Sequence, residues 1–206
     1  MNTQDNRPLA QQKPCGGFKR TISRGRKLSA IKYKEYCYWG NMATRCNNTN
    51  YSDKYPTYQE ATMSTGFKDY NYFVEWCRSQ PEFFKDFWVL DKDILVPNNK
   101  VYSENTCCFI PPQINGFLTM RKSFVRDLPT GVSWCHSEGK YKTCCANLDG
   151  KNMTVGRFSD SETAFDAYVK TKNELARYLA DIWEGEVSQN VTTILRNFDV
   201  RDYLVD

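Results

Sequence analysis

Three carboxylates in the middle of the chain are of the type that binds a divalent metal ion. Asp91 and Asp93 lie two residues apart, so on a strand their side chains would share one face, and Glu104 follows shortly after them. Carboxylate oxygens are preferred ligands of Mg²⁺. These three residues are therefore candidate catalytic and metal-binding groups. The alternative is a structural role, in which the two aspartates are turn or cap residues tied to Lys92 or Lys100.

The nine cysteines do not have the spacing of a structural zinc site or of a disulfide framework. Their number is odd, no Cys-x-x-Cys pair occurs, and His136 is the single histidine. The adjacent pairs 107–108 and 144–145 would point to opposite faces of a strand. We therefore expect reduced cysteines that act as small apolar side chains.

Residues 131–172 have the pattern of three short strands followed by one amphipathic helix. Strand-favouring side chains alternate along each run, and the dipeptides at 138–139 and 149–150, Glu-Gly and Asp-Gly, suit tight hairpin turns. A helix cap is expected among residues 159–161. The helix then has an apolar stripe, interrupted by one lysine, at Phe165, Tyr168, Lys172, Leu175, Leu179 and Ile182. The pattern alone describes a sheet backed by a helix, with no implied ligand.

Five short motifs in this segment match, in order and spacing, those of the Apetala-two DNA-binding domain. They are Gly131-Val132, Gly139-Lys140-Tyr141, Gly150-Lys151, Val155-Gly156-Arg157-Phe158 and Ala164-Phe165-Asp166-Ala167-Tyr168. The segment thus resembles this domain, which is known from plant ethylene-response factors and from homing endonucleases of phages and mobile elements. The resemblance implies a three-stranded antiparallel sheet that lies in the major groove of double-stranded DNA, with the helix behind it.

The resemblance also implies which side chains face DNA. By position they are Ser133, Cys135, Cys144, Ala146, Asn152, Thr154 and Tyr168, with phosphate contacts from Lys140, Lys142, Lys151 and Arg157. The plant domains carry several arginines where this chain has Ser, Cys and Ala. Because Arg reads guanine through a bidentate contact, we do not expect the sequence preference of the plant domains here.

Basic side chains gather at the beginning of the chain and on the predicted sheet. Residues 1–30 carry seven basic and one acidic side chain, and residues 119–158 carry seven basic and three acidic ones, whereas residues 159–206 carry five basic and ten acidic ones. This polarity would orient the chain on a polyanion. The first segment reads as a flexible basic arm, or alternatively as a tail that only aids solubility. The arm would lie along a DNA groove through Arg24, Arg26 and Lys27.

A second, helix-rich unit is predicted between the arm and the sheet. Residues 33–47 and 66–79 have helical apolar spacing, and strand-like runs follow at 90–95 and 101–111, separated by a polar turn. We expect these two runs to form a short hairpin. The aromatic residues of this unit are expected to form its core.

The central unit resembles the segment that precedes the DNA-binding domain in phage proteins related to HNH homing endonucleases. The motifs are Trp39-x-x-Met42-x-x-Arg45-Cys46, Phe73-x-x-Trp76, Leu90-Asp91-Lys92-Asp93, Asn99-Lys100-x-Tyr102-Ser103 and Asn115. An HNH nuclease uses a histidine as general base beside a metal ion. The resemblance puts an Asp-His pair where this chain has Asp91-Lys92. A protonated lysine is no general base at neutral pH, so the resemblance implies a nuclease remnant with a degenerate active site.

The sequence therefore predicts an α+β fold with four parts. These are a disordered basic arm (1–30), a central α+β domain (31–117), a domain with a three-stranded antiparallel sheet on one long helix (118–184) and a C-terminal helix and tail (185–206). We expect no secretory signal and no membrane span, and reduced cysteines suit a cytoplasmic location, that of an infected host if the protein is phage-encoded.

Three functions are compatible with these features. The first is a double-stranded DNA-binding protein that cleaves little or not at all and needs no cofactor. The second is an active homing-type endonuclease that uses Mg²⁺ at the candidate carboxylates. The third is a viral protein that contacts a host protein through its acidic C-terminal helices, including a helix predicted over residues 188–198.

Overall fold

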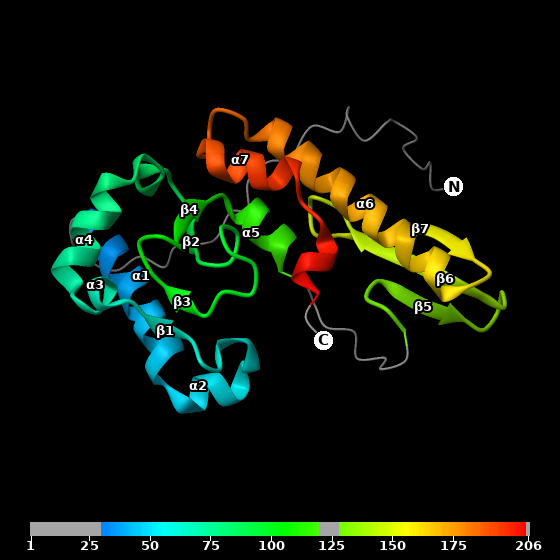
Figure 1. Cartoon of the computed structure of the whole chain (residues 1–206), viewed down its shortest axis with the longest axis horizontal. Helices are drawn as coiled ribbons and strands as arrows, with labels where there is room; N and C mark the ends of the chain where they lie inside the picture. The colour runs from blue at the N-terminus through cyan, green and yellow to red at the C-terminus, as the bar shows by residue number, and fades with distance from the viewer. Residues whose placement is uncertain (1–29, 120–127, 205–206) are drawn as a thin grey trace.

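The computed structural model describes residues 30–119 and 128–204. These residues form an α+β structure in which a three-stranded sheet and a long helix lie at one end and a group of helices with short strands lies at the other (Figure 1). Residues 1–29 of the predicted arm lie outside the described residues, and with them the candidate contacts Arg24, Arg26 and Lys27.

The central unit begins with two helices that follow each other closely. Helix α1 spans Ala30–Asn47 and confirms the helix predicted over 33–47. Helix α2 spans Thr49–Lys54 and begins where the Asn48 side chain accepts a hydrogen bond of 3.1 Å from the amide of Tyr51. A 3₁₀ turn, η2, follows at Pro56–Tyr58.

The single helix predicted over 66–79 is two helices in the structure. They are α3 (Thr65–Lys68) and α4 (Tyr70–Ser79), and the 3₁₀ turn η3 (Pro81–Phe84) follows them. The break lies at Asp69, which has an extended backbone and whose side chain accepts hydrogen bonds from the amides of Asn71 and Tyr72. An Asp side chain in this geometry caps a new helix, a local interaction that the apolar periodicity does not show.

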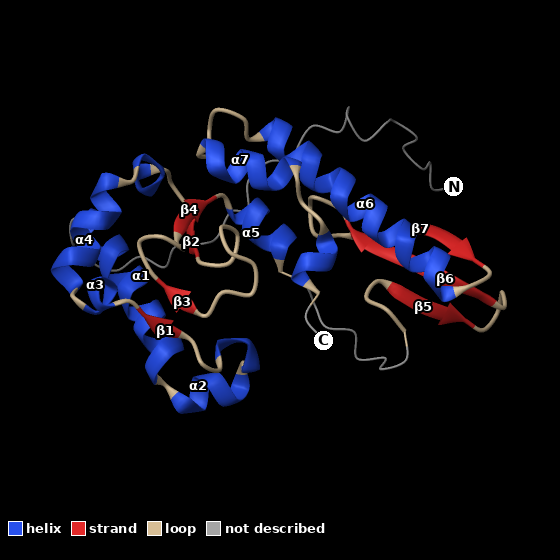
Figure 2. Ribbon diagram, viewed as in Figure 1, coloured by secondary structure: helices blue, strands red, loops and turns tan. Residues whose placement is uncertain are grey.

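The strands of the central unit are shorter than predicted and pair differently. They are β1 (Thr62–Met63), β2 (Val89–Asp91), β3 (Val101–Tyr102) and β4 (Cys108–Ile110). Strand β2 pairs antiparallel with β4, while β3 pairs parallel with β1 (Figure 2). The predicted 101–111 strand is interrupted because Ser103 and Thr106 form a turn, with a 2.8 Å contact between their hydroxyls. Helix α5 (Pro112–Leu118) follows β4 at the end of this unit.

The sheet and its helix agree with the prediction. Strands β5 (Val132–Cys135), β6 (Lys140–Ala146) and β7 (Asn152–Phe158) form an antiparallel sheet in the order β5-β6-β7. Both predicted turns contain a glycine with positive φ, Gly139 at +59° and Gly150 at +76°. Helix α6 spans Ser161–Ile182 and is capped by Asp160, whose carboxylate accepts from the amide of Thr163 at 2.7 Å.

The chain ends on a short helix that packs beside α6. Helix α7 spans Gln189–Arg196 and is capped by Ser188, in agreement with the helix predicted over 188–198. The 3₁₀ turn η4 (Val200–Tyr203) follows, and Asn173 of α6 accepts a 3.0 Å hydrogen bond from the amide of Val200.

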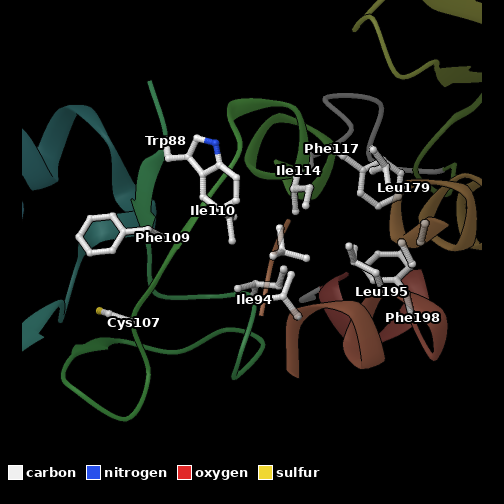
Figure 3. Packing of buried hydrophobic residues seen from close by; sticks show 14 of the residues in the cluster. Trp88, Ile94, Cys107, Phe109, Ile110, Ile114, Phe117, Leu179, Leu195 and Phe198 are labelled. Atoms are coloured by element: carbon white, nitrogen blue, oxygen red, sulfur yellow. The ribbon is translucent and has the colours of Figure 1, made fainter. Parts of the chain in front are cut away.

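One apolar core connects the two ends of the molecule. Figure 3 shows residues of α5 beside residues of α6 and α7, with Phe117 near Leu179. The Phe117 and Phe198 rings lie 5.4 Å apart, and the indole of Trp183 donates a 3.0 Å hydrogen bond to Gln113. The core therefore crosses the predicted domain boundaries at 117/118 and 184/185. Helix α6 packs on the sheet with its beginning and on the central unit with its end.

Candidate nucleic-acid interface

The strand register divides the side chains of the β5–β7 sheet between two faces. On one face the hydroxyl of Thr143 donates a 2.7 Å hydrogen bond to the carbonyl of Ala164 in α6, and Val132 and Cys145 are buried. This face of the sheet therefore packs against α6, and side chains alternate between the two faces along each strand. The neighbours of these residues point to the opposite side, which we call the open face.

Nearly all the predicted DNA-facing side chains lie on the open face. Cross-strand pairs align Ser133 with Lys142 and Lys142 with Arg157, and they align Cys135 with Lys140. None of the open-face residues is buried. The complete set is Ser133, Cys135, Lys140, Lys142, Cys144, Ala146, Asn152, Thr154 and Arg157.

A β-bulge keeps this set together. Gly156 pairs with Thr143 and Thr154 pairs with Cys144, so Val155 is an additional residue in β7. In a regular strand Thr154 and Arg157, which are three positions apart, would lie on opposite faces, and the bulge at Val155 brings them to the same face. A bulge also increases the local twist of the strands.

The open face has a basic half and an uncharged half. Lys140, Lys142 and Arg157 lie toward the β5–β6 turn. Toward the β6–β7 turn the side chains are small and uncharged: Cys144, Ala146, Asn152 and Thr154. Lys151, exposed in the β6–β7 turn, adds a positive charge beyond this half.

Arg157 differs from the three lysines because it has a carboxylate partner. Its Nε atom forms an ion pair with Glu138 of the β5–β6 turn, and both side chains remain partly exposed. Within the described part of the chain, Lys140, Lys142 and Lys151 form no ion pair. Sequence reasoning did not identify Glu138 as part of this surface, because the contact depends on how the turn folds toward β7.

The position of Tyr168 corrects one predicted DNA contact. Tyr168 is in α6, is 6% exposed and lies between the helix and the sheet. Its ring lies against Gly131, where an added Cβ would be 2.2 Å from a ring carbon, and burial raises the pKa of Tyr168 to about 12. A side chain in this position supports the sheet from behind and does not reach a ligand on the open face.

The candidate metal-binding aspartates have structural contacts. Asp91 ends β2 and is buried, and its Oδ1 atom accepts hydrogen bonds from the amides of Asp93 and Ile94 at 2.9 and 2.7 Å. Burial raises the pKa of Asp91. Asp93 pairs with Lys92, whose Nζ also donates to the carbonyl of Asn99, both at 2.5 Å. These are the turn and ion-pair roles that formed the alternative to a metal site.

The third carboxylate, Glu104, has other partners. It accepts a 2.9 Å hydrogen bond from Ser64 and a 3.4 Å bond from the hydroxyl of Tyr72, and hydrogen bonding lowers the pKa of Glu104. In residues 30–119 and 128–204, no three His, Cys, Asp or Glu side chains come together as a possible metal site. The structure thus does not unite Asp91, Asp93 and Glu104 into one site.

Two further features bear on the predicted chemistry. All eight cysteines in the described ranges are free thiols. Among the described helices, none has the length and apolar character needed to cross a bilayer.

Comparison of the chain with known protein families, with curated proteins and with solved structures finds no match. The two family resemblances therefore remain predictions based on the motifs that suggested them, and any function must be argued from the geometry of the open face.

Proposed function

We propose that this protein binds double-stranded DNA with the open face of the β5–β7 sheet in the major groove. The observation that carries the proposal is the strand register, which aligns Ser133, Lys142 and Arg157 across three strands on the face that α6 leaves uncovered. The same face holds three more cross-strand pairs of polar or small side chains, namely Cys135 with Lys140, Cys144 with Thr154, and Ala146 with Asn152.

The dimensions of the sheet suit the groove. Three antiparallel strands about 4.8 Å apart span roughly 10 Å, and the major groove of B-DNA is about 12 Å wide. Strands β6 and β7 have seven residues each. At about 3.4 Å per residue they extend roughly 24 Å, so they would follow the groove over several base pairs.

The distribution of charge supports the same orientation. Lys140, Lys142 and Lys151 have no carboxylate partner in the described structure, so their ammonium groups are available to phosphates. The exposed side of α6, behind the sheet, carries Glu162 and Glu174. A basic surface with acidic groups behind it turns its basic side toward a polyanion.

A salt titration with two matched variants tests this proposal. Lys142→Gln removes a charge from the open face, and Lys170→Gln removes one from the exposed side of α6. Loss of one phosphate contact should reduce the slope of log K against log salt concentration by about 0.9. We expect this reduction for Lys142→Gln and an unchanged slope for Lys170→Gln, measured by fluorescence anisotropy with a duplex. Absence of duplex binding at about 50 mM salt, or equal effects of both substitutions, would overturn the proposal.

A further inference from the structure

We infer that the uncharged half of the open face selects A·T base pairs, with Asn152 reading an adenine. This inference rests on the proposed function and adds a base preference to it. It concerns Cys144, Ala146, Asn152 and Thr154, which lie together in two cross-strand rows next to the β6–β7 turn.

The chemistry of these four side chains matches the major-groove edge of an A·T pair. The Oδ1 atom of an Asn side chain accepts a hydrogen bond from the N6 amino group of adenine while its Nδ2 atom donates one to adenine N7, so the amide makes a bidentate pair with adenine. Small apolar groups such as the methyl groups of Ala and Thr contact the thymine methyl group. Guanine is read mainly by Arg or Lys, and neither residue type occurs in this half of the face.

Asn152 is free to make such a contact. It is exposed, and within the described structure its side-chain amide has no hydrogen-bond partner. Ala146 is its cross-strand neighbour. Cβ atoms of directly opposed residues lie about 5 Å apart, which is close to the spacing of one to two base pairs at about 3.4 Å each. An amide and a methyl group are thus placed to contact neighbouring bases.

The β6–β7 turn holds Asn152 in a defined position. The side chain of Asn147 accepts hydrogen bonds from the amides of Asp149 and Lys151 at 3.0 and 2.9 Å, and the amide of Asn147 donates to the carbonyl of Lys151 at 2.8 Å. Lys151, the residue that precedes Asn152, is therefore fixed by two of these hydrogen bonds, and the third holds Asp149 in the same turn. A side chain on a rigid strand end loses less conformational freedom on binding than one on a mobile loop.

The basic half has a different role in this arrangement. Lys140 and Lys142 hold phosphates and contribute affinity without base preference, whereas Asn152 contributes preference without net charge. The two contributions are therefore separable by mutation. Removal of Asn152 should change base discrimination and leave the salt dependence unchanged, and removal of Lys142 should do the reverse.

The test begins with selection from a randomised duplex pool by the wild-type protein. We expect enrichment of sequences with an A·T core. A bidentate contact is equivalent to about 5- to 150-fold in the ratio of dissociation constants for G·C and A·T cores, and Asn152→Ala should remove that factor. The matched variant Asn190→Ala, at an exposed position of α7, should keep it.

Modified bases identify the atoms involved. Replacement of adenine by 7-deazaadenine should weaken wild-type binding but not binding by Asn152→Ala, and replacement of thymine by uracil should weaken both, because the methyl contacts remain in the variant. Equal wild-type affinity for A·T and G·C cores, or a preference that persists in Asn152→Ala, would overturn the inference while duplex binding itself stands. Failure of the wild-type protein to bind any duplex would instead overturn the proposed function, and the inference with it.

Discussion

Glu138→Gln is predicted to strengthen DNA binding, because Glu138 opposes it in two ways. Its carboxylate pairs with Arg157 and also places a negative charge beside the basic half of the open face. The substitution keeps the shape of the side chain, removes the charge and releases the guanidinium of Arg157. Both side chains are 40% or more exposed, and an exposed ion pair contributes at most about 1 kcal/mol to stability. The variant should therefore remain folded.

The size of the effect follows from counterion release. One additional phosphate contact increases the magnitude of the salt slope by about 0.9, so a fourfold increase in salt weakens that contact about 3.5-fold. The affinity gain of Glu138→Gln over wild type should thus be about 3.5 times larger at 50 mM than at 200 mM salt. Fluorescence anisotropy with a short duplex at four or five salt concentrations measures both quantities.

Two control variants show whether Arg157 is the cause. Glu174→Gln removes the same charge from the exposed side of α6 and should leave the slope unchanged. In the double variant Glu138→Gln/Arg157→Gln the slope should return to its wild-type value, because the released cation is gone. An unchanged slope in Glu138→Gln, or an increase that persists in the double variant, would refute the reasoning.

The remaining predictions concern stability. Gly131→Ala should lower the free energy of unfolding by about 2–4 kcal/mol, because Gly131 has φ +82° and an added Cβ would collide with the Tyr168 ring. Gly139→Ala, at φ +59° with open space around it, should cost only about 1 kcal/mol; equal losses in urea titrations would contradict the packing argument. Burial lowers the pKa of Lys172 from 10.5 to about 8, so between these values the unfolded chain binds a proton that the folded chain lacks, and stability rises with pH. The unfolding free energy of wild type minus that of Lys172→Met should therefore rise by roughly 3 kcal/mol between pH 8 and pH 10.5. A difference that stays constant over this pH range would contradict the lowered pKa of Lys172. Asp91→Ala should cost about 1–3 kcal/mol, because two backbone amides lose their acceptor; the loss should be the same with and without Mg²⁺, and dependence on Mg²⁺ would support the metal site.

The sheet and its helix were predictable because their signals are local. Each turn has a glycine that adopts the required positive φ, and the α6 stripe places its one lysine, Lys172, at a buried position. The lysine is accommodated in this buried position because its Nζ donates a 2.7 Å hydrogen bond to the carbonyl of Phe117. The same Nζ lies 3.8 Å from the centre of the Phe117 ring. Period and turn chemistry therefore suffice for this part of the fold.

The central unit was predicted less well because its structure depends on side-chain contacts with the backbone. Asp69 begins a new helix within a continuous apolar pattern, and Ser103 and Thr106 interrupt a strand. Neither event changes the hydrophobic period. The pairing of β3 with β1 joins residues about 40 positions apart, Thr62 with Val101, and no local signal predicts such a contact.

The two candidate sites also differ in how well the sequence predicted them. The strand residues that the family resemblance implies as DNA-facing do share one face, with the help of the β7 bulge, whereas the alternation argument applied to Asp91 and Asp93 failed because β2 ends at Asp91. Tyr168 was carried over from a family pattern, and its burial became evident only from the packing of α6 on Gly131.

Alkylation of two adjacent cysteines tests the central claim most directly. Cys144 lies on the open face, while Cys145 points to α6, is 2% exposed and has a pKa raised by burial. With iodoacetamide and mass spectrometry, we expect Cys144 and Cys135 to react in the free protein and to be protected by duplex DNA. Cys145 should be unreactive in both states, and Cys37 of α1 should react equally with and without DNA. Tight DNA binding that leaves Cys144 and Cys135 as reactive as in the free protein would contradict the claim that the open face is the binding surface.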